Sequence, residues 1–335
     1  MTLKEIAEQT GYSVSTVSRV LNGGAYKENS KTYAAITEFA QTNGYSRGSR
    51  SGRIVANLVP DISNPISAAI AKTIQHICKN AGLFLMIINT NEDPKEESRA
   101  LQVLAKLNLY GLIYSPVIED ESQDFVSFKI GGEKERVPVV MIGRELPFVS
   151  YDSVCINNIA GAFDATSYLL EKGVTDIAVI AGPRNTKPGR ERLEGFFQAY
   201  RYHNIQPPPA ERIFYGDFTT DSGYAQAQAI FRSSPRPQAI FPMNNLMTRG
   251  CLRAMMEAGI PIGSAQDGAM EMVSFDGDDL LDIVAPEVPY VQRPVEEMGR
   301  VAMSLLLNRV NRGSREASPI QHIELNPILK IPGKK

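Results

Sequence analysis

The spacing of apolar and polar positions changes near residue 53 of this chain. Residues 1–45 hold short segments with helical spacing between polar breaks, whereas from residue 54 apolar runs of strand length alternate with longer amphipathic segments. Strands are predicted over 54–59, 83–89, 111–114, 137–142, 177–181, 239–242 and 272–275. Helices are predicted over 65–81, 94–107, 160–172, 189–203, 221–232, 244–258 and 294–310. Apolar strands that alternate with helices indicate parallel sheets covered on both faces.

This pattern predicts an α/β protein with three parts. Residues 1–45 are expected to form an all-α domain, and the Ser-, Arg- and Gly-rich residues 46–53 a flexible basic linker. The remaining residues, 54–335, suit two doubly wound lobes. Lobe 1 is expected at about 54–157 and 290–318, and lobe 2 at about 158–289 and 319–332. Because such sheets bind ligands at the carboxyl ends of their strands, a small-molecule site is predicted in the cleft between the lobes.

Charge separates the two ends of the chain. The formal net charge is −2, so no global positive field draws the protein to nucleic acid. Residues 1–53 nevertheless carry seven Lys or Arg against four acids, which gives +3 there and −5 in the remainder. A contact with nucleic acid is therefore expected only from the N-terminal end.

Cysteine usage and the absence of an apolar leader indicate the compartment. Cys78, Cys155 and Cys251 are scattered in apolar surroundings, as expected for core residues in a reducing environment. The chain opens with no charged-then-apolar leader and holds no apolar run of about 18 residues. A cytoplasmic protein without a membrane segment is predicted.

Residues 2–22 have the spacing of a helix-turn-helix. Thr2 is expected to cap a first helix with Glu5 completing a capping box, Gly11 to permit the turn, and Ser13 to cap a second helix over 14–22. On the second helix, the residues predicted to pack inward are Val17, Val20 and Leu21, and those predicted to face outward are Val14, Ser15, Ser18 and Arg19.

The outward residues suit contact with DNA. Arg19 is expected to pair with guanine, and Val14 and Ser15 to meet a neighbouring base or a thymine methyl. Phosphate contacts are expected from Thr16, Ser18, Asn22 and Lys31. The whole predicted DNA-binding set is Thr2, Ser13, Val14, Ser15, Thr16, Ser18, Arg19, Asn22, Lys31, Tyr45, Arg47, Arg50 and Arg53. By itself, a short polar helix with one arginine equally fits a helix that only packs on a core.

A wider ordered set of motifs favours the DNA-binding interpretation. The sequence resembles the lactose-repressor family of bacterial regulators in residues 2–7, 11, 13–22, 43–45, 59–65, 182–183, 191–196, 216–218, 222–224, 275–276 and 294–299. The resemblance spans essentially the whole chain. It implies an operator-binding headpiece, a hinge and a core like that of periplasmic sugar-binding proteins. It also implies a repressor that works as a homodimer on double-stranded, near-palindromic operator DNA.

The connector departs from the family. Members usually carry an Ala- and Leu-rich hinge helix whose leucine enters the minor groove, and here residues 46–53 replace it with Ser, Arg and Gly. Binding in which an inserted leucine separates two base steps and kinks the DNA is therefore not expected. Arg47, Arg50 and Arg53 are instead expected to follow phosphates or to lie in a narrow minor groove. A solvated linker without DNA contacts is the alternative.

The resemblance also implies the effector residues. Arg192 matches the family's cleft arginine, Asp276 its cleft aspartate, and Arg293 stands where a glutamine is usual. Phe218 suits an apolar platform for a sugar face, although a core role fits nearly as well. The predicted effector-binding set is Asn64, Ile66, Ser115, Arg144, Arg190, Arg192, Phe218, Asn244, Asp276 and Arg293.

Three departures from the family favour an anionic effector. Gly143 stands where relatives often have an aspartate, Arg293 stands where a glutamine is usual, and Arg184, Lys187 and Arg190 precede Arg192. Fewer acids and more bases favour a sugar acid or sugar phosphate over a neutral sugar. An exposed rim of arginines is the alternative. Neither a metal nor a cofactor is expected.

Two other functions are weighed against regulation. Enzyme chemistry is not expected, since the chain has no phosphate-binding loop, nucleophile elbow or zinc-protease motif, and His76, His203 and His322 are dispersed. A sugar-binding protein of a transport system would share the two lobes, but it should open with a signal peptide and not with a helix-turn-helix.

Overall fold

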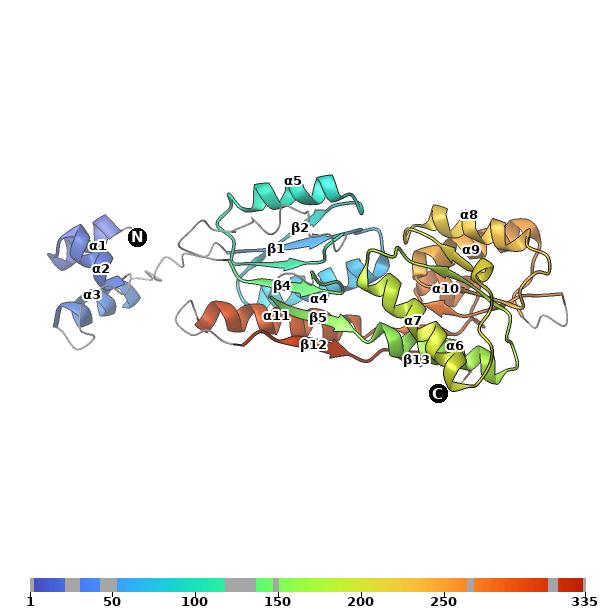
Figure 1. Ribbon diagram of the computed structural model, residues 1–335. Coiled ribbons are helices and arrows are strands. Elements are labelled where there is room, and N and C mark those ends of the chain that lie inside the picture. The colour runs from blue at the N-terminus through green and yellow to red at the C-terminus, as the bar shows by residue number, and fades with distance from the viewer. Residues whose placement is uncertain are drawn as a thin grey trace. The chain divides into compact units, whose positions relative to one another are not determined.

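A computed structural model describes residues 3–21, 31–42, 53–117, 137–146, 151–263, 268–312 and 319–333. The chain divides into two compact units, 1–52 and 53–335 (Figure 1). The predicted linker, apart from Arg53, lies outside the described residues.

The described residues of the first unit, 3–21 and 31–42, form three helices around a small core of their own. It contains α1 (Leu3–Thr10), α2 (Val14–Leu21) and α3 (Lys31–Thr42). The residues buried together between these helices are Ile6, Ala7, Val17, Val20, Leu21, Ile36 and Ala40. The three residues of α2 that the sequence predicts to face inward are therefore buried.

The second unit begins with a six-stranded parallel sheet that forms lobe 1. Its strand order is β12-β5-β4-β3-β1-β2. The strands are β1 (Ile54–Val59), β2 (Phe84–Asn89), β3 (Gly111–Tyr114), β4 (Val139–Ile142), β5 (Asp152–Ile156) and β12 (His322–Leu325). Helices α4 (Pro65–Asn80) and α11 (Val295–Arg312) cover one face, and α5 (Pro94–Leu104) covers the other (Figure 1).

Alternation along β1 explains why both faces of this sheet are covered. Val55 packs with Ile70 and Ile74 of α4, whereas Ala56 and Leu58 belong to the cluster of α5. Successive side chains of a strand point to opposite faces, so a nearly continuous apolar strand needs a helix layer on each side.

Lobe 2 contains two smaller sheets. The four-stranded parallel sheet has the order β7-β6-β8-β9, and the three-stranded sheet has the order β10-β11-β13, with β13 antiparallel to β11. The strands are β6 (Ile177–Ala181), β7 (Ile213–Tyr215), β8 (Ala239–Pro242), β9 (Glu271–Met272), β10 (Ser274–Phe275), β11 (Tyr290–Gln292) and β13 (Ile328–Lys330). The helices are α6 (Asn158–Glu171), α7 (Lys187–Tyr202), α8 (Thr220–Phe231), α9 (Asn245–Ala258), α10 (Asp279–Val284) and the 3-10 helix η2 (Ala210–Arg212).

The strand pairing corrects the expected lobe boundaries at two places. Residues 319–332 were assigned to lobe 2, but β12 pairs in parallel with β5 of lobe 1, with Ser153 beside His322. Residues 290–318 were assigned to lobe 1, but β11 pairs with β10 and β13 of lobe 2. Both strands are short, with four residues in β12 and three in β11, so distant partners and not local pattern determine their place.

Within the described residues, the chain crosses between the lobes three times: from β5 to α6, from β11 to α11 and from β12 to β13. The first and third crossings are joined by a hydrogen bond from Asn157 N to Leu325 O at 2.9 Å. Gly161 of α6 follows the first crossing, Val291 of β11 precedes the second, and Pro327 lies in the third. A Cβ added at Gly161 would lie only 2.9 Å from Val291 and 3.0 Å from Pro327, so the three crossings pack closely together.

The described helices include none that is both long and apolar enough to span a bilayer. Cys78, Cys155 and Cys251 are all buried and unpaired. Burial raises the pKa of the Cys78 thiol to about 11, which leaves it protonated at neutral pH.

Candidate functional site

The first unit presents α2 after a tight turn. Gly11 adopts a φ of +74°, and its N–H donates to Ala7 O at 3.0 Å, which ends α1. Ser13 Oγ then accepts from Thr16 N at 3.1 Å, and Ser13 O accepts from Val17 N at 3.0 Å. Ser13 is thus the N-cap of α2.

The two sides of α2 differ in exposure. Val17 and Val20 are buried, whereas Val14, Ser15 and Arg19 are exposed, and Ser18 is half-buried. Lys31, the first residue of α3, is also exposed. This arrangement leaves the helix face with Arg19 accessible to a partner.

Five of the residues predicted to contact DNA lie outside the described residues: Thr2, Asn22, Tyr45, Arg47 and Arg50. Arg53 is exposed at the start of the second unit.

The second unit holds a cavity of about 110 Å³ between its lobes, where loops at the carboxyl ends of strands meet. Ser115 follows β3, Arg144 follows β4 and Asn244 follows β8. The lining residues are Asn57, Val59, Pro60, Asp61, Asn64, Ile66, Ser67, Ile70, Glu92, Ser115, Ile142, Gly143, Arg144, Pro188, Arg192, Phe218, Thr219, Asn244, Leu246, Arg293 and Met298.

The structure brings most of the predicted effector residues together here. Those that line the cavity are Asn64, Ile66, Ser115, Arg144, Arg192, Phe218, Asn244 and Arg293. Asp276 lies just behind them in contact with Arg293. Arg190 is exposed on α7, where its guanidinium donates to Arg184 O at 3.3 Å, so it is not part of the cavity wall.

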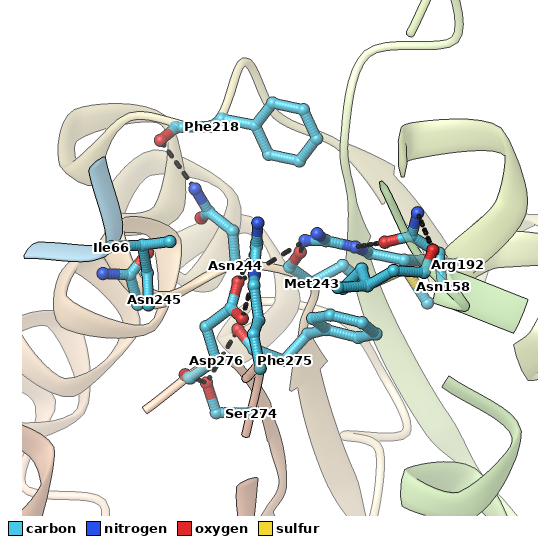
Figure 2. A network of polar contacts seen from close by, with 12 residues as sticks. Ile66, Asn158, Arg192, Phe218, Met243, Asn244, Asn245, Ser274, Phe275 and Asp276 are labelled. Atoms are coloured by element: carbon cyan, nitrogen blue, oxygen red, sulfur yellow. Dashed lines mark hydrogen bonds and ion pairs between the residues drawn. The ribbon is translucent and has the colours of Figure 1, made fainter. Parts of the chain in front are cut away.

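Arg192 is the most enclosed charged group of the cavity wall, with 2% of its surface exposed. Its Nε donates to Asn158 Oδ1 at 2.9 Å and its Nη1 to Met243 O at 2.5 Å (Figure 2). The guanidinium carbon lies 3.8 Å from the centre of the Phe275 ring, a cation–π contact. Burial, followed by the neighbouring Arg293, lowers the pKa of Arg192 to about 9. The side chain therefore stays charged at neutral pH.

The other two arginines of the wall are held in bidentate ion pairs. Arg293 donates through Nε to Asp276 Oδ1 at 2.6 Å and through Nη2 to Asp276 Oδ2. Arg144 donates to both oxygens of Glu92 at 2.6 and 2.8 Å. The wall also contains Asp61, which accepts from Ser63 N and Oγ. Counted with Glu92 of the wall and Asp276 behind it, Asp61 gives the site three carboxylates for its three arginines.

Two residues of the site have left-handed backbone. Phe218 has a φ of +70° and Asp276 a φ of +69°, a conformation that bulky side chains rarely adopt. The Phe218 carbonyl accepts from Asn244 Nδ2 at 2.9 Å, which helps to hold this turn. Strained backbone of this kind concentrates at ligand sites.

Polar contacts join the lobes around the cavity. Asn245 Nδ2 of α9 donates to Asn64 Oδ1 at 3.1 Å, and Asn64 caps α4. Lys187 Nζ of α7 donates to Glu145 Oε2 of lobe 1 at 2.6 Å. These contacts stabilise the observed arrangement of the two lobes.

Sequence reasoning missed several residues of the site. Glu92 follows β2 and is brought to Arg144 only by the fold, so no local signal marked it. Asn57 had a signal, because it is a polar residue inside an apolar strand. Among the described residues no cluster of His, Cys, Asp or Glu suits a metal ion. Asp278 caps α10, where its Oδ1 accepts from Leu280 N and Leu281 N.

Comparisons with known proteins cover both units. Residues 166–330 match the family described as a periplasmic binding protein-like domain. The chain is 30% identical to the HTH-type transcriptional regulator DegA of Bacillus subtilis (strain 168), over 98% of this chain and 96% of that protein. It is 28% identical to the ribose operon repressor of Escherichia coli (strain K12), over 98% of each. The solved complex of the transcriptional regulator CelR with cellobiose is similar, with a TM-score of 0.72, 27% identity and coverage of 99% and 98%.

Proposed function

Because the chain belongs to the LacI family of transcription regulators, we propose that it represses transcription by binding operator DNA through α2. We further propose that a small sugar-like effector in the cavity between the lobes controls this binding. The observation that carries the proposal is the combination, in one chain, of a capped helix with an exposed arginine face and a cavity lined from both lobes. The proposal includes action by binding and not by catalysis, and a cytoplasmic location, where operator DNA would be reached.

The DNA contact is assigned to the exposed side of α2. Arg19 presents a planar fork that matches the acceptors of guanine in the major groove, and Val14 and Ser15 precede it by one turn. Ser18, which is half-buried, and Lys31, which is exposed, are proposed to contact phosphates. The buried Val17 and Val20 hold the helix on its core, which leaves the opposite side for base edges.

The effector is proposed to be a compact polyhydroxy molecule. The cavity volume of about 110 Å³ is small beside the roughly 300–1,000 Å³ of typical ligand pockets. Paired guanidinium and carboxylate groups offer donors and acceptors together, as hydroxyl groups require. Phe218, with Arg144 and Arg192 guanidinium carbons 5.7 and 5.9 Å from its ring centre, supplies an apolar surface for a sugar face. The names of the ribose repressor and of the cellobiose complex support this class.

The balanced charges of the wall support a neutral sugar over the anion that the sequence favoured. Arg184 and Arg190 are exposed, and Lys187 is bonded to Glu145. Arg144 and Arg293 already have carboxylate partners. A neutral effector needs no further counter-charge at this site.

Control requires that the effector prefer one arrangement of the lobes. The cavity wall comes from both lobes, so a bound molecule bridges them and favours the closed form. In a dimer, this changes the spacing of the two DNA-binding domains relative to half-sites about one helical turn apart. Exposed apolar side chains on α10 (Ile283 and Val284) and on the edge strand β2 (Phe84) support dimerisation through these elements.

The DNA half of the proposal is tested with Arg19→Ala in the full chain. Fluorescence anisotropy with promoter fragments selected from the source genome should show a loss of affinity of about tenfold or more, since a bidentate base contact is worth about 1–3 kcal/mol. Arg99→Ala, which removes an exposed arginine of α5, is the matched control and should bind as the wild type does. Equal binding by both variants would refute the assignment of α2.

The effector half is tested by thermal shift with D-ribose, D-glucose, cellobiose, D-gluconate and D-fructose 1-phosphate. Stabilisation by a neutral sugar is expected. Stabilisation by the anionic compounds alone would restore the anionic class, and no stabilisation by any of the five would count against a sugar-like effector.

A further inference from the structure

Asn57 is a buried amide without a partner. It lies in the middle of β1, between Ala56 and Leu58, and is 0% exposed. Neither its Oδ1 nor its Nδ2 has a hydrogen-bond partner among the described residues. Buried amides are nearly always bonded, because leaving both groups unpaired costs free energy. An unpaired amide in a strand interior therefore indicates a group that is satisfied by something other than the protein.

The surroundings of Asn57 connect it to the cavity. Its side chain shares a face of the sheet with Val55 and Val59, and it lines the cavity together with Val59, Ile70, Ile142 and Met298. These neighbours come from β1, α4, β4 and α11 of lobe 1 and carry no charge. The cavity therefore has two chemically different ends, one with paired arginines and carboxylates and one with a single amide among aliphatic side chains.

We infer that the end formed by Asn57 is a separate subsite that takes an uncharged hydroxyl group on a short carbon arm, such as the hydroxymethyl group of a monosaccharide. An amide donates and accepts at once, and a hydroxyl group does the same, so one such group satisfies both atoms. The aliphatic walls suit the CH₂ group of the arm. An ionised carboxylate or phosphate does not fit, because no side chain of this end supplies a counter-charge.

This assignment fixes the orientation of the effector. Its ring hydroxyls meet Arg192 and Arg293 of the cavity wall, and its hydroxymethyl arm points into lobe 1 toward Asn57. The inference rests on the proposed sugar-like effector and adds to it a specificity-determining residue that selects sugars with a free primary hydroxyl group.

The test compares Asn57→Leu with the wild type, using two sugar pairs that differ only in this hydroxyl group: D-ribose with 5-deoxy-D-ribose, and D-glucose with 6-deoxy-D-glucose. In isothermal titration the wild type should bind one parent sugar about tenfold or more tightly than its deoxy analogue, because the analogue leaves the amide unpaired. In Asn57→Leu this ratio should fall to about one. The apo variant should unfold at an equal or higher temperature than the wild type.

Ser167→Ala is the matched control. Ser167 Oγ is also buried without a partner among the described residues, but it lies on α6 and does not line the cavity. This variant should keep the preference of the wild type. If Asn57→Leu fails to fold, Asn57→Val serves in its place, since it is β-branched and suits a strand.

The outcomes separate the inference from the proposed function. If Asn57→Leu keeps the preference for the parent sugar, the inference is wrong and the amide is satisfied by buried water. If the wild type binds parent and analogue equally, the inference is also wrong while the sugar effector stands. If the wild type binds none of the four sugars, the inference is wrong, and the thermal shift with the five compounds decides separately whether the sugar-like effector stands.

Discussion

Replacing Arg293 by methionine should remove about 3 kcal/mol of the free energy of unfolding. The change keeps the aliphatic stem and deletes both hydrogen bonds to Asp276, whose side chain is 0% exposed. Two unit charges about 4 Å apart interact by about 4 kcal/mol at an effective dielectric constant of about 20. Removing one partner of a buried pair costs about 3–5 kcal/mol because the other charge remains unpaired. Arg192 Nη1, at 3.8 Å from Asp276 Oδ2, retains part of the attraction.

Urea unfolding followed by circular dichroism measures this loss, since the chain has no tryptophan for fluorescence. Arg300→Met is the control: Arg300 pairs with Glu297 on the surface of α11, 63% of its side chain is exposed, and its loss should cost about 0.5 kcal/mol or less. The double variant Asp276→Asn with Arg293→Met should recover more than half of the loss, because no unpaired charge is left. If Arg293→Met costs no more than Arg300→Met, the pair does not contribute as argued.

Two further predictions concern the lobes and the dimer. Burial alone would raise the pKa of Glu145, but hydrogen bonds from Lys187 and Ser153 lower it below 4.5, so the stability that Glu145 contributes is complete above pH 4.5 and is lost as the pH falls below it. Lowering the pH from 6 to 3 should therefore reduce the melting temperature of the wild type more than that of Glu145→Gln. Parallel curves of melting temperature against pH would refute this. Ile283→Lys places a charge on an α10 position that is 77% exposed, and analytical ultracentrifugation should then show a monomer in place of a dimer. The control Tyr202→Lys on α7, at 72% exposure, should remain a dimer. A dimer in both variants would mean that α10 is not part of the interface.

Local pattern predicted most of the helices, the strands β1, β2, β3, β4, β6 and β8, and the buried face of α2, but not the strands β5, β7, β11 and β13. Val17, Val20 and Leu21 are buried as helical spacing predicts, because that spacing places them on the side of the small core. The long apolar strands were likewise predicted, since a strand covered on both faces has few polar positions. Strand β12 was not predicted, because its place beside β5 depends on a partner 169 residues away.

The sequence predicted most residues of the candidate site but not which of them form ion pairs with each other. Arg192, Asp276 and Arg293 meet as the resemblance implied, yet Arg293 is bound to Asp276 and Arg144 to Glu92. Sequence counts bases and acids, but it does not show which of them are already bonded to each other. The expectation of an anionic effector came from such a count and stays a prediction that the thermal shift tests. The same limit led to Arg190 being included in the predicted site, although its exposed side chain does not line the cavity.

The three segments that cross between the lobes lie close together, and this arrangement limits how the lobes can move. One covalent connection would leave rotation about that connection unrestrained. Three neighbouring connections restrain such rotation and leave bending at the crossings as the least restrained movement. Energy released on capturing a small molecule is then directed into a single hinge angle, which suits a protein that must report occupancy to a distant site.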